Sequence, residues 1–458
     1  MKTDRPNILL VMSDQHNARC LGCAGEPLLS TPNLDRLASE GVRFTNAFAN
    51  SIHCGPSRVS FLTGMYEHSH LRHKNTDEPP DHLNPLTGLL RAQGYQTALI
   101  GKGHLGVRWP RREFDHTRLD ILTDAFPDDP LSCDYFRYLV EQGQADNFDL
   151  SRKYTYTDDP ARRSPLPFEH SEEVWVGNET LEYLRGRDRS RPFFLFASFQ
   201  RPHNPLTVSA PYDTLYDPSD VVLPSSAGDT FETKSERQKR GAAGQMRYPF
   251  RPPTEEYLRK CMAYYYALVT IIDMQIGRMI KALEDEGALD NTIVIYTADH
   301  GDFAAEHGFM YKNLGFYDCL HRIPWIMRYP GTLPAGECFE GCVESVDLYP
   351  TLTDMLGLQN PWTVQGRSFA EAANGAAKWT KQSSLAEHVK SYHHMSLRTA
   401  DHRITVDAKG TEHELYDYRL DPDELVNRWD DPGCRELRER LMLDMLRFRA
   451  CPDLLFGP

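Results

Sequence analysis

The 458-residue chain lacks any apolar run long enough to cross a membrane, and it lacks an excess of positive charge. Lysine and arginine number 51 against 65 aspartates and glutamates, which gives a formal net charge of −14. A surface of this sign repels nucleic acid and anionic membranes, so we expect neither as a partner. The apolar residues 8–12 form too short a stretch for the core of a signal peptide, so we expect no targeting segment and a cytoplasmic location.

Patterned cysteines are also missing. Cys20 and Cys23 form a Cys-x-x-Cys pair, but no second pair of this kind completes a zinc site. Cys338 and Cys342 lie four residues apart and match no disulfide framework of a small secreted domain. We therefore interpret most of the ten cysteines as incidental thiols of a reduced protein.

Two kinds of apolar segment alternate along the first 360 residues. Continuous apolar runs predict buried strands at residues 7–13, 42–49, 96–101, 193–199, 291–297 and 323–328. Apolar residues at helical spacing predict helices at residues 31–41, 57–63, 83–94, 172–187, 254–287 and 347–358. The alternation predicts an α/β fold with one large, mostly parallel sheet that is covered by helices on both faces.

The pattern changes after about residue 358. Short polar-apolar alternations at residues 384–389, 395–399, 402–406 and 413–418 predict a small antiparallel sheet, and residues 435–449 predict a closing amphipathic helix. We therefore expect a catalytic domain at residues 1–370 and a C-terminal antiparallel-sheet and helix subdomain at 371–458. Residues 106–167 and 205–253 look irregular, and we expect lids or specificity loops there.

Polar and ionisable residues follow four of the predicted strands. They are Asp14 with Gln15, Lys102 with His104, His203, and Asp299 with His300. One such residue alone is more often a turn or cap residue. Four strand ends predicted on the same rim of one sheet indicate a ligand site, because ligands of open α/β sheets bind at the carboxyl ends of strands.

The chemistry of these residues is mutually consistent. Asp14, Gln15 and Asp299 offer oxygen ligands for a hard divalent cation, and the imidazole of His300 shifts the preference slightly toward Mn²⁺ or Zn²⁺. Positive charge for an anionic transition state comes from lysines and an arginine, and histidines that titrate near neutral pH supply acid-base groups. These are Arg58, Lys102, Lys312, His104 and His203.

Residues 54–64 read CGPSRVSFLTG, and this run resembles the motif of the sulfatase family. Other segments are similar to the family in the same order: TPNLDRLA at 31–38, GVRF at 41–44, GKGH at 101–104, PHNP at 202–205, TADHGD at 297–302, EHG at 306–308, LYD at 415–417 and DPDE at 421–424. Each short segment alone supports the resemblance only moderately. All of them together, in this order and over most of the chain, support it strongly.

The resemblance implies the fold of the alkaline phosphatase superfamily and a hydrolase of sulfuric esters. It further implies that a formylglycine-generating enzyme converts Cys54 into an aldehyde whose hydrate attacks sulfur. The metal ligands it implies are Asp14, Gln15, Cys54, Asp299 and His300. The expected cation is Ca²⁺, with Mn²⁺, Mg²⁺ and Zn²⁺ as alternatives.

The resemblance also implies roles for the remaining site residues. Lys102 and Lys312 would bind the sulfuryl oxygens, and Arg58 would hold the hydrate beside the metal carboxylates. His203 would protonate or stabilise the leaving oxygen, which makes it a substrate contact as well. His104 would accept the proton of the second hydroxyl of the hydrate.

Two positions depart from the commonest sulfatase pattern. Gln15 stands where many members have a second aspartate, and His300 stands where some have asparagine. This combination also resembles phosphonate monoester and phosphodiester hydrolases. Relatives with the Asp-Gln pair often have an asparagine at about the position of Asn75, so we expect Asn75 to contact substrate. Sulfate is favoured over phosphorus esters because Lys102, His104 and His203 suit the sulfatase pattern better. A catalytically silent binding protein on the same scaffold is a further alternative, but it would need to have lost metal or substrate ligands.

We therefore expect a small-molecule sulfate ester as the substrate, with aryl, alkyl and sugar esters all open. We also consider a homo-oligomer that associates through the C-terminal segment.

Overall fold

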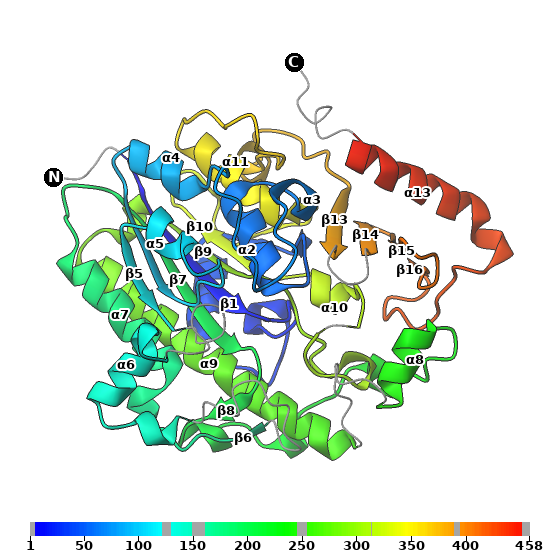
Figure 1. Cartoon of the computed structure of the whole chain (residues 1–458), viewed down its shortest axis with the longest axis horizontal. Helices are drawn as coiled ribbons and strands as arrows, with labels where there is room; N and C mark the ends of the chain where they lie inside the picture. Colours follow the sequence, from blue (N-terminus) through cyan, green and yellow to red (C-terminus); the bar gives the residue numbers. More distant parts are fainter. Residues whose placement is uncertain are drawn as a thin grey trace.

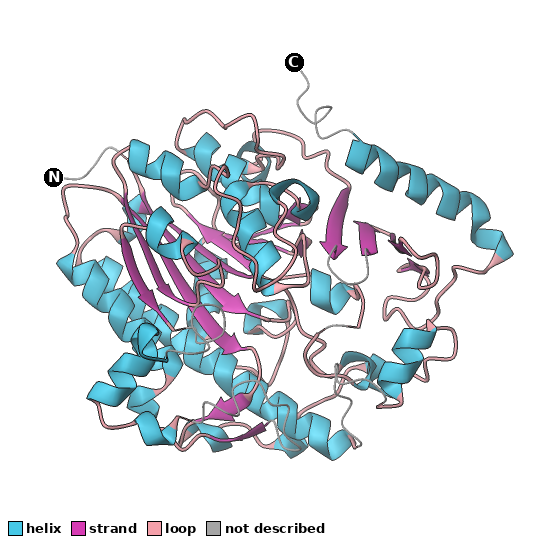
Figure 2. Cartoon of the chain, viewed as in Figure 1, coloured by secondary structure: helices cyan, strands magenta, loops and turns pink. Residues whose placement is uncertain are grey.

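The computed structural model describes residues 5–120, 130–148, 161–244, 254–312, 314–388 and 394–450. Its centre is an eight-stranded sheet with the order β11-β2-β10-β9-β1-β7-β4-β5 (Figures 1 and 2). The strands are β1 (Asn7–Asp14), β2 (Val42–Phe44), β4 (Gln96–Gly101), β5 (His116–Leu119), β7 (Phe193–Pro202), β9 (Thr292–Ala298), β10 (Trp325–Arg328) and β11 (Glu337–Phe339). β10 runs antiparallel to β9 and β2, and the other neighbouring pairs are parallel, so the predicted mostly parallel sheet is confirmed.

Helices cover both faces of this sheet (Figure 1). On β1, Ile8, Leu10 and Met12 pack into one core, whereas Leu9 and Val11 pack into the other. The first core is completed by α2 (Cys54–Thr63), α4 (Leu86–Ala92), α5 (Trp109–Glu113), α11 (Leu348–Met355) and α12 (Ala370–Ala373). The second is completed by α1 (Pro32–Glu40), α6 (Asp134–Glu141), α7 (Glu172–Gly186) and α9 (Glu255–Asp285). Burial on two faces explains why the central strands are continuously apolar.

The long helix α9 follows the predicted range closely. Its N-cap is Thr254, whose Oγ1 accepts a hydrogen bond from the backbone N of Tyr257 at 3.2 Å. Ile272, Ile276 and Met279 recur at helical spacing and are buried in the second core. Truncating one of them to alanine would cost about 2–5 kcal/mol of folding free energy.

Two predicted elements near the candidate nucleophile have different bounds. The strand expected at residues 42–49 is divided into β2 and β3 (Ala47–Phe48), and β3 pairs with β12 (Val343–Glu344) instead of joining the large sheet. Helix α2 begins at Cys54, three residues before the predicted start, because the backbone N of Ser57 already donates to the carbonyl of His53. Pro56 fits this first turn, where its missing N–H is not needed. Cys54 therefore lies on a helix and not in a loop.

The prediction that residues 106–167 are irregular was wrong for their described part. This part contains α5, α6 and the edge strand β5, which pairs in parallel with β4. Residues 205–244 include β8 (Leu206–Val208), paired with β6 (Ala161–Arg163), and α8 (Glu236–Ala242). Short edge strands carry little apolar pattern, which explains why they were not predicted. Residues 121–129, 149–160 and 245–253 lie outside the described residues.

A separate four-stranded antiparallel sheet follows the large one, as predicted. Its order is β13-β14-β15-β16, and its strands are β13 (Ser383–His388), β14 (His394–Thr399), β15 (His402–Asp407) and β16 (Glu414–Asp417). Helix α13 (Arg435–Ala450) packs on it through Leu441 and Met445 (Figure 1). The division of the chain at residue 370 stays a prediction.

Among the helices of the described ranges, none has the length and apolar content that crossing a bilayer requires. The two short helices not yet named are α3 (Glu67–His70) and α10 (Asp318–His321).

Candidate active site

The four polar strand ends meet on one rim of the large sheet. Strands β9, β1, β7 and β4 are neighbours and run in the same direction, so the residues that follow them lie side by side. The residues at the ends of these strands are, in the same order, Asp299, Asp14, His203 and Lys102. The predicted grouping at the carboxyl edge is therefore confirmed.

Cys54 lies at the centre of a buried polar cluster. Its Sγ lies 3.2 Å from Nε2 of His300 and 3.6 Å from Oδ1 of Asp14, and Nζ of Lys312 donates to it at 2.9 Å. One ligand atom from each of Asp14, Cys54, Asp299 and His300 lies within 4.8 Å of the other three. The first turn of α2 thus places Cys54 against the ends of β1 and β9.

This cluster fits a divalent cation. Asp14 and Asp299 supply carboxylate oxygens, and His300 supplies an imidazole nitrogen. Nδ1 of His300 donates to the carbonyl of Gly301 at 2.9 Å, which directs Nε2 toward the cluster. Burial, assisted by the charge of Lys312, lowers the pKa of His300 to about 3, so the ring is neutral and free to act as a ligand at pH 7.

Gln15 presents an oxygen for which the described residues supply no hydrogen-bond donor. Its Nε2 donates to Oδ2 of Asp302 at 2.6 Å, and its backbone N donates to Oδ1 of Asp299 at 3.1 Å. The remaining amide oxygen, Oε1, is buried without such a partner. Because an unsatisfied buried carbonyl is costly, a cation or a water is expected there. The sequence reasoning gave Asp302 no role, although it lies only three residues after Asp299.

Arg58 donates hydrogen bonds to residues from three strands of the large sheet or their ends. Its Nε donates to Oδ2 of Asp299 at 2.8 Å, and its Nη1 donates to the carbonyl of Lys102 at 2.8 Å and to Oγ of Ser198 at 2.7 Å. Burial alone would raise the pKa of Asp299, but the positive charges around it, those of Arg58 and of two lysines, hold it below its usual range. The carboxylate therefore stays ionised and available to a cation.

Two lysines bring positive charge to the rim. Nζ of Lys102 forms an ion pair with Asp14, and Nζ of Lys312 lies 2.8 Å from Nε2 of His300. Lys102 reaches this place because Gly101 has a φ of +92°, and a Cβ there would lie 1.9 Å from the carbonyl oxygen of Ser198. Only glycine fits this approach, so Gly101 supports the position of the lysine.

The two candidate acid-base histidines lie in the same positive field. Burial lowers the pKa of His104, and the charge of Lys102 lowers it further. Burial also lowers the pKa of His203, with Lys312 as the next cause. Nδ1 of His203 donates to the carbonyl of Asn204 at 2.7 Å, which leaves Nε2 as its reactive nitrogen.

Asn75 binds the backbone next to Cys54. Its Oδ1 accepts a hydrogen bond from the N of Gly55, next to Cys54, at 3.0 Å. The buried Arg72 donates to the carbonyl of Asn75 at 2.7 Å. It also packs closely on Gly55, where a Cβ would lie 2.8 Å from Nη2 of Arg72. Sequence reasoning missed Arg72, because an arginine inside a polar, histidine-rich stretch looks solvated.

The arrangement suits attack on an anionic tetrahedral ester. Burial raises the pKa of the Cys54 thiol, although Lys312 opposes this, so the thiol is protonated and a poor nucleophile. The cations of Lys102 and Lys312 can neutralise charge that develops on ester oxygens. The positive charge of the site thus suits an anionic ester, whereas its unmodified thiol is poorly suited to attack one.

Known proteins resemble this chain in sequence and in fold. Residues 6–358 match the sulfatase family model, and residues 305–450 match a family described as "N-sulphoglucosamine sulphohydrolase, C-terminal". An arylsulfatase of Clostridium perfringens is 31% identical over 97% of this chain and 93% of its own length. The multifunctional alkaline phosphatase superfamily protein PehA of Trinickia caryophylli is 33% identical over 80% and 76%. The solved structure of phosphonate monoester hydrolase SpPMH from Silicibacter pomeroyi superposes with a TM-score of 0.83 at 26% identity, covering 97% of this chain and 95% of that one.

Proposed function

The chain belongs to the sulfatase family and is by family a sulfuric ester hydrolase, and from this premise we propose that it converts a small sulfate ester into an alcohol or phenol and inorganic sulfate. The observation that carries the proposal is the position of Cys54, whose Sγ is surrounded by Asp14, His300 and Lys312 at 2.9–3.6 Å. We further propose that Cys54 is the position of formylglycine.

Formylglycine would account for the buried position of Cys54. When present, the hydrated aldehyde supplies one hydroxyl for attack on sulfur and a second whose deprotonation restores the aldehyde. A maturation enzyme that generates formylglycine is therefore a required partner. The raised pKa of the Cys54 thiol supports this proposal, because the encoded side chain is poorly suited to act unmodified.

A divalent cation would be held by Asp14, Asp299 and His300, with Oε1 of Gln15 as a further oxygen. When bound, it supplies Lewis acidity and lowers the pKa of a coordinated hydroxyl. The mainly oxygen donor set favours Ca²⁺, with Mn²⁺, Mg²⁺ or Zn²⁺ as alternatives.

The remaining residues would bind and polarise the ester. Lys102 and Lys312 would contact the sulfuryl oxygens, and Arg58 would keep Asp299 ionised while holding the nucleophile. Asn75 would contact substrate beside Gly55.

Proton transfer would use the two histidines. The neutral ring of His203 carries its proton on Nδ1, so Nε2 donates to the leaving oxygen only after the ring takes up a second proton. The negative charge of a bound ester favours that uptake. His104, kept neutral by burial and by Lys102, would accept a proton when sulfate leaves.

We propose a cytoplasmic location and a small imported ester. The nine cysteines of the described residues are free thiols, which supports a reducing compartment. Self-association through the C-terminal segment stays a prediction.

A phosphonate monoester or phosphodiester hydrolase is the second candidate. Gln15 favours it, because an amide in place of a second aspartate leaves the site with less negative charge. The fold is also closely similar to that of a phosphonate monoester hydrolase.

A direct comparison of substrates tests both candidates. The purified, metal-loaded protein would be assayed with 4-nitrophenyl sulfate, bis(4-nitrophenyl) phosphate and 4-nitrophenyl phenylphosphonate. We expect the highest kcat/KM with the sulfate. A kcat/KM that is about 100-fold higher for a phosphorus ester, equivalent to about 2.7 kcal/mol of transition-state stabilisation, would replace our proposal by the second candidate.

A further inference from the structure

One guanidinium holds the turn that carries His203. Nη1 of Arg201 donates to the carbonyl oxygens of His203 at 2.9 Å and of Pro205 at 2.8 Å. Nη2 donates to Oγ1 of Thr207, on β8, at 3.3 Å. The backbone on both sides of the imidazole is thus bound to a single side chain.

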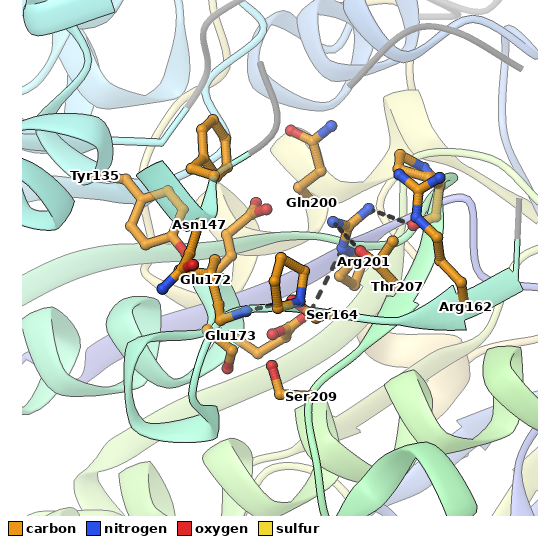
Figure 3. Close-up of a pocket in the computed structure, with 15 residues that line it drawn as sticks. Tyr135, Asn147, Arg162, Ser164, Glu172, Glu173, Gln200, Arg201, Thr207 and Ser209 are labelled. Carbon is orange, nitrogen blue, oxygen red and sulfur yellow. Dashed lines mark hydrogen bonds and ion pairs between the residues drawn. The ribbon is translucent and has the colours of Figure 1, made fainter. Parts of the chain in front are cut away.

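Arg201 also forms an ion pair with a helix, although its buried Nε makes no hydrogen bond within the described residues. Its Nε lies 3.5 Å from Oε1 of Glu173, in the first turn of α7, and both side chains are largely buried, with exposures of 13% and 5%. Figure 3 shows this pair in the wall of a cavity of about 80 Å³, with the dashed line from Arg201 to Glu173. The carboxylate of Glu172 also lines this cavity, but its buried Oε1 has no hydrogen-bond partner among the described residues.

The contacts form a chain from α7 to the imidazole. Glu173 forms an ion pair with Arg201, and Arg201 donates to the carbonyls of His203 and Pro205. The carbonyl of Asn204, between them, accepts a hydrogen bond from Nδ1 of the ring. His203 is only partly buried, so packing alone restrains it less than it restrains Cys54. The hydrogen bonds of Arg201 therefore restrain the backbone from which the imidazole projects.

We propose that Arg201, oriented by Glu173, is a positioning residue that aims Nε2 of His203 at the departing oxygen of the ester. This inference rests on the proposed function, in which His203 protonates that oxygen. A misplaced acid matters most when the leaving group is a weakly acidic alcohol, because such a group needs the proton in the transition state. An acidic phenol leaves readily without it.

The dependence of rate on leaving-group acidity tests the inference. Wild type, Arg201→Met, Glu173→Gln and His203→Ala would be assayed with 4-nitrophenyl sulfate and phenyl sulfate. For Arg201→Met we expect kcat to fall by about 10- to 100-fold with phenyl sulfate but less than about 3-fold with the nitrophenyl ester, with little change in KM. Glu173→Gln should act in the same direction with a smaller effect, and Arg201→Lys should recover part of the rate.

Two matched variants serve as controls. Arg162→Met and Glu172→Gln change the same residue types in the same cavity wall. Within the described residues, no hydrogen bond or ion pair joins either side chain to residues 203–205, which Arg201 holds. We expect both to keep the wild-type ratio of the two rates. If Arg201→Met fails to fold, as judged by its thermal unfolding, Glu173→Gln and Arg201→Lys decide the question.

A double variant gives the sharpest outcome. If Arg201 acts through His203, Arg201→Met adds no further loss to His203→Ala with phenyl sulfate. The inference would be overturned if Arg201→Met lowered kcat equally with both esters. It would also be overturned if the losses of Arg201→Met and His203→Ala multiplied in the double variant. If the wild-type protein hydrolyses no aryl sulfate, the proposed function fails, and the same variants assayed with aryl phosphonates still decide whether Arg201 positions His203.

Discussion

Nζ of Lys312 lies 2.9 Å from Sγ of Cys54, and both side chains are buried. An ammonium so close to the nucleophile stabilises the charge that develops as the ester is attacked. We expect Lys312→Met to lower kcat/KM with 4-nitrophenyl sulfate by about 10²- to 10³-fold, the loss typical of removing one preorganised donor. Lys281→Met, at an exposed lysine paired with Asp285, is the control and should keep full activity. Comparable rates for the two variants would contradict a role for Lys312.

Cys54→Ala removes the proposed source of the nucleophile. We expect its activity to fall to background while its thermal unfolding stays close to wild type, because the thiol contributes little to the core. Mass analysis of the peptide containing residue 54 should show the aldehyde in active wild-type protein. Cys338→Ala, at an exposed cysteine, is the matched control. Full activity of Cys54→Ala, or an unmodified thiol in active enzyme, would refute formylglycine chemistry.

Removing the cation should affect stability as well as activity. The buried carboxylates of Asp14 and Asp299 lie together, and a bound cation stabilises the folded state by about 2.7 kcal/mol when its concentration is 100 times Kd. We expect a chelator to lower both Tm and kcat, and Ca²⁺ to restore both. Metal analysis of the same sample gives the stoichiometry.

His300→Ala provides the control for this experiment. With one ligand removed, the variant should bind less metal, and its Tm should respond much less to chelation. A wild-type Tm and metal content that chelation leaves unchanged would argue against a cation at this cluster.

The rim of the site was predictable because its residues follow strongly apolar strands. The runs that became β1, β7 and β9 are buried on both faces, so their patterns were distinct and their ends placed Asp14, His203 and Asp299 correctly. The helix start at Cys54 was less predictable, because the small residues around it have no periodicity. The edge strand β5, with four residues of mostly intermediate burial, left no clear pattern.

The supporting residues could not be predicted, because their roles depend on distant partners. Asp302 matters through the amide of Gln15, and Arg201 matters through Glu173 on another element. No local pattern distinguishes such arginines and aspartates from solvated ones. Sequence reasoning therefore indicated the candidate reacting groups but not the contacts around them.

Asp318, at the start of α10, joins this helix to the small antiparallel sheet and should make stability pH-dependent. Its carboxylate accepts hydrogen bonds from Nε of Arg322 at 2.8 Å and from Nε of Arg398, on β14, at 2.7 Å. Burial alone would raise the pKa of Asp318, but Arg322 and Arg398 hold it well below its usual range. Because the folded-state pKa lies below the unfolded value of about 3.9, the stabilisation is present above about pH 4 and is lost as the pH falls further.

Denaturant unfolding of Asp318→Asn would measure this contribution. At pH 7 we expect the free energy of unfolding to fall by about 1.5–3 kcal/mol, the range for hydrogen bonds to a charged group. The difference from wild type should shrink as the pH is lowered below about 4, because the wild-type carboxylate is then increasingly protonated on unfolding. Asp290→Asn breaks the ion pair between the exposed Asp290 and Arg328 and should have a smaller effect at every pH. A difference for Asp318→Asn that stays constant down to the acid limit of folding would show that the charge of Asp318 does not stabilise the contact between α10 and the small sheet.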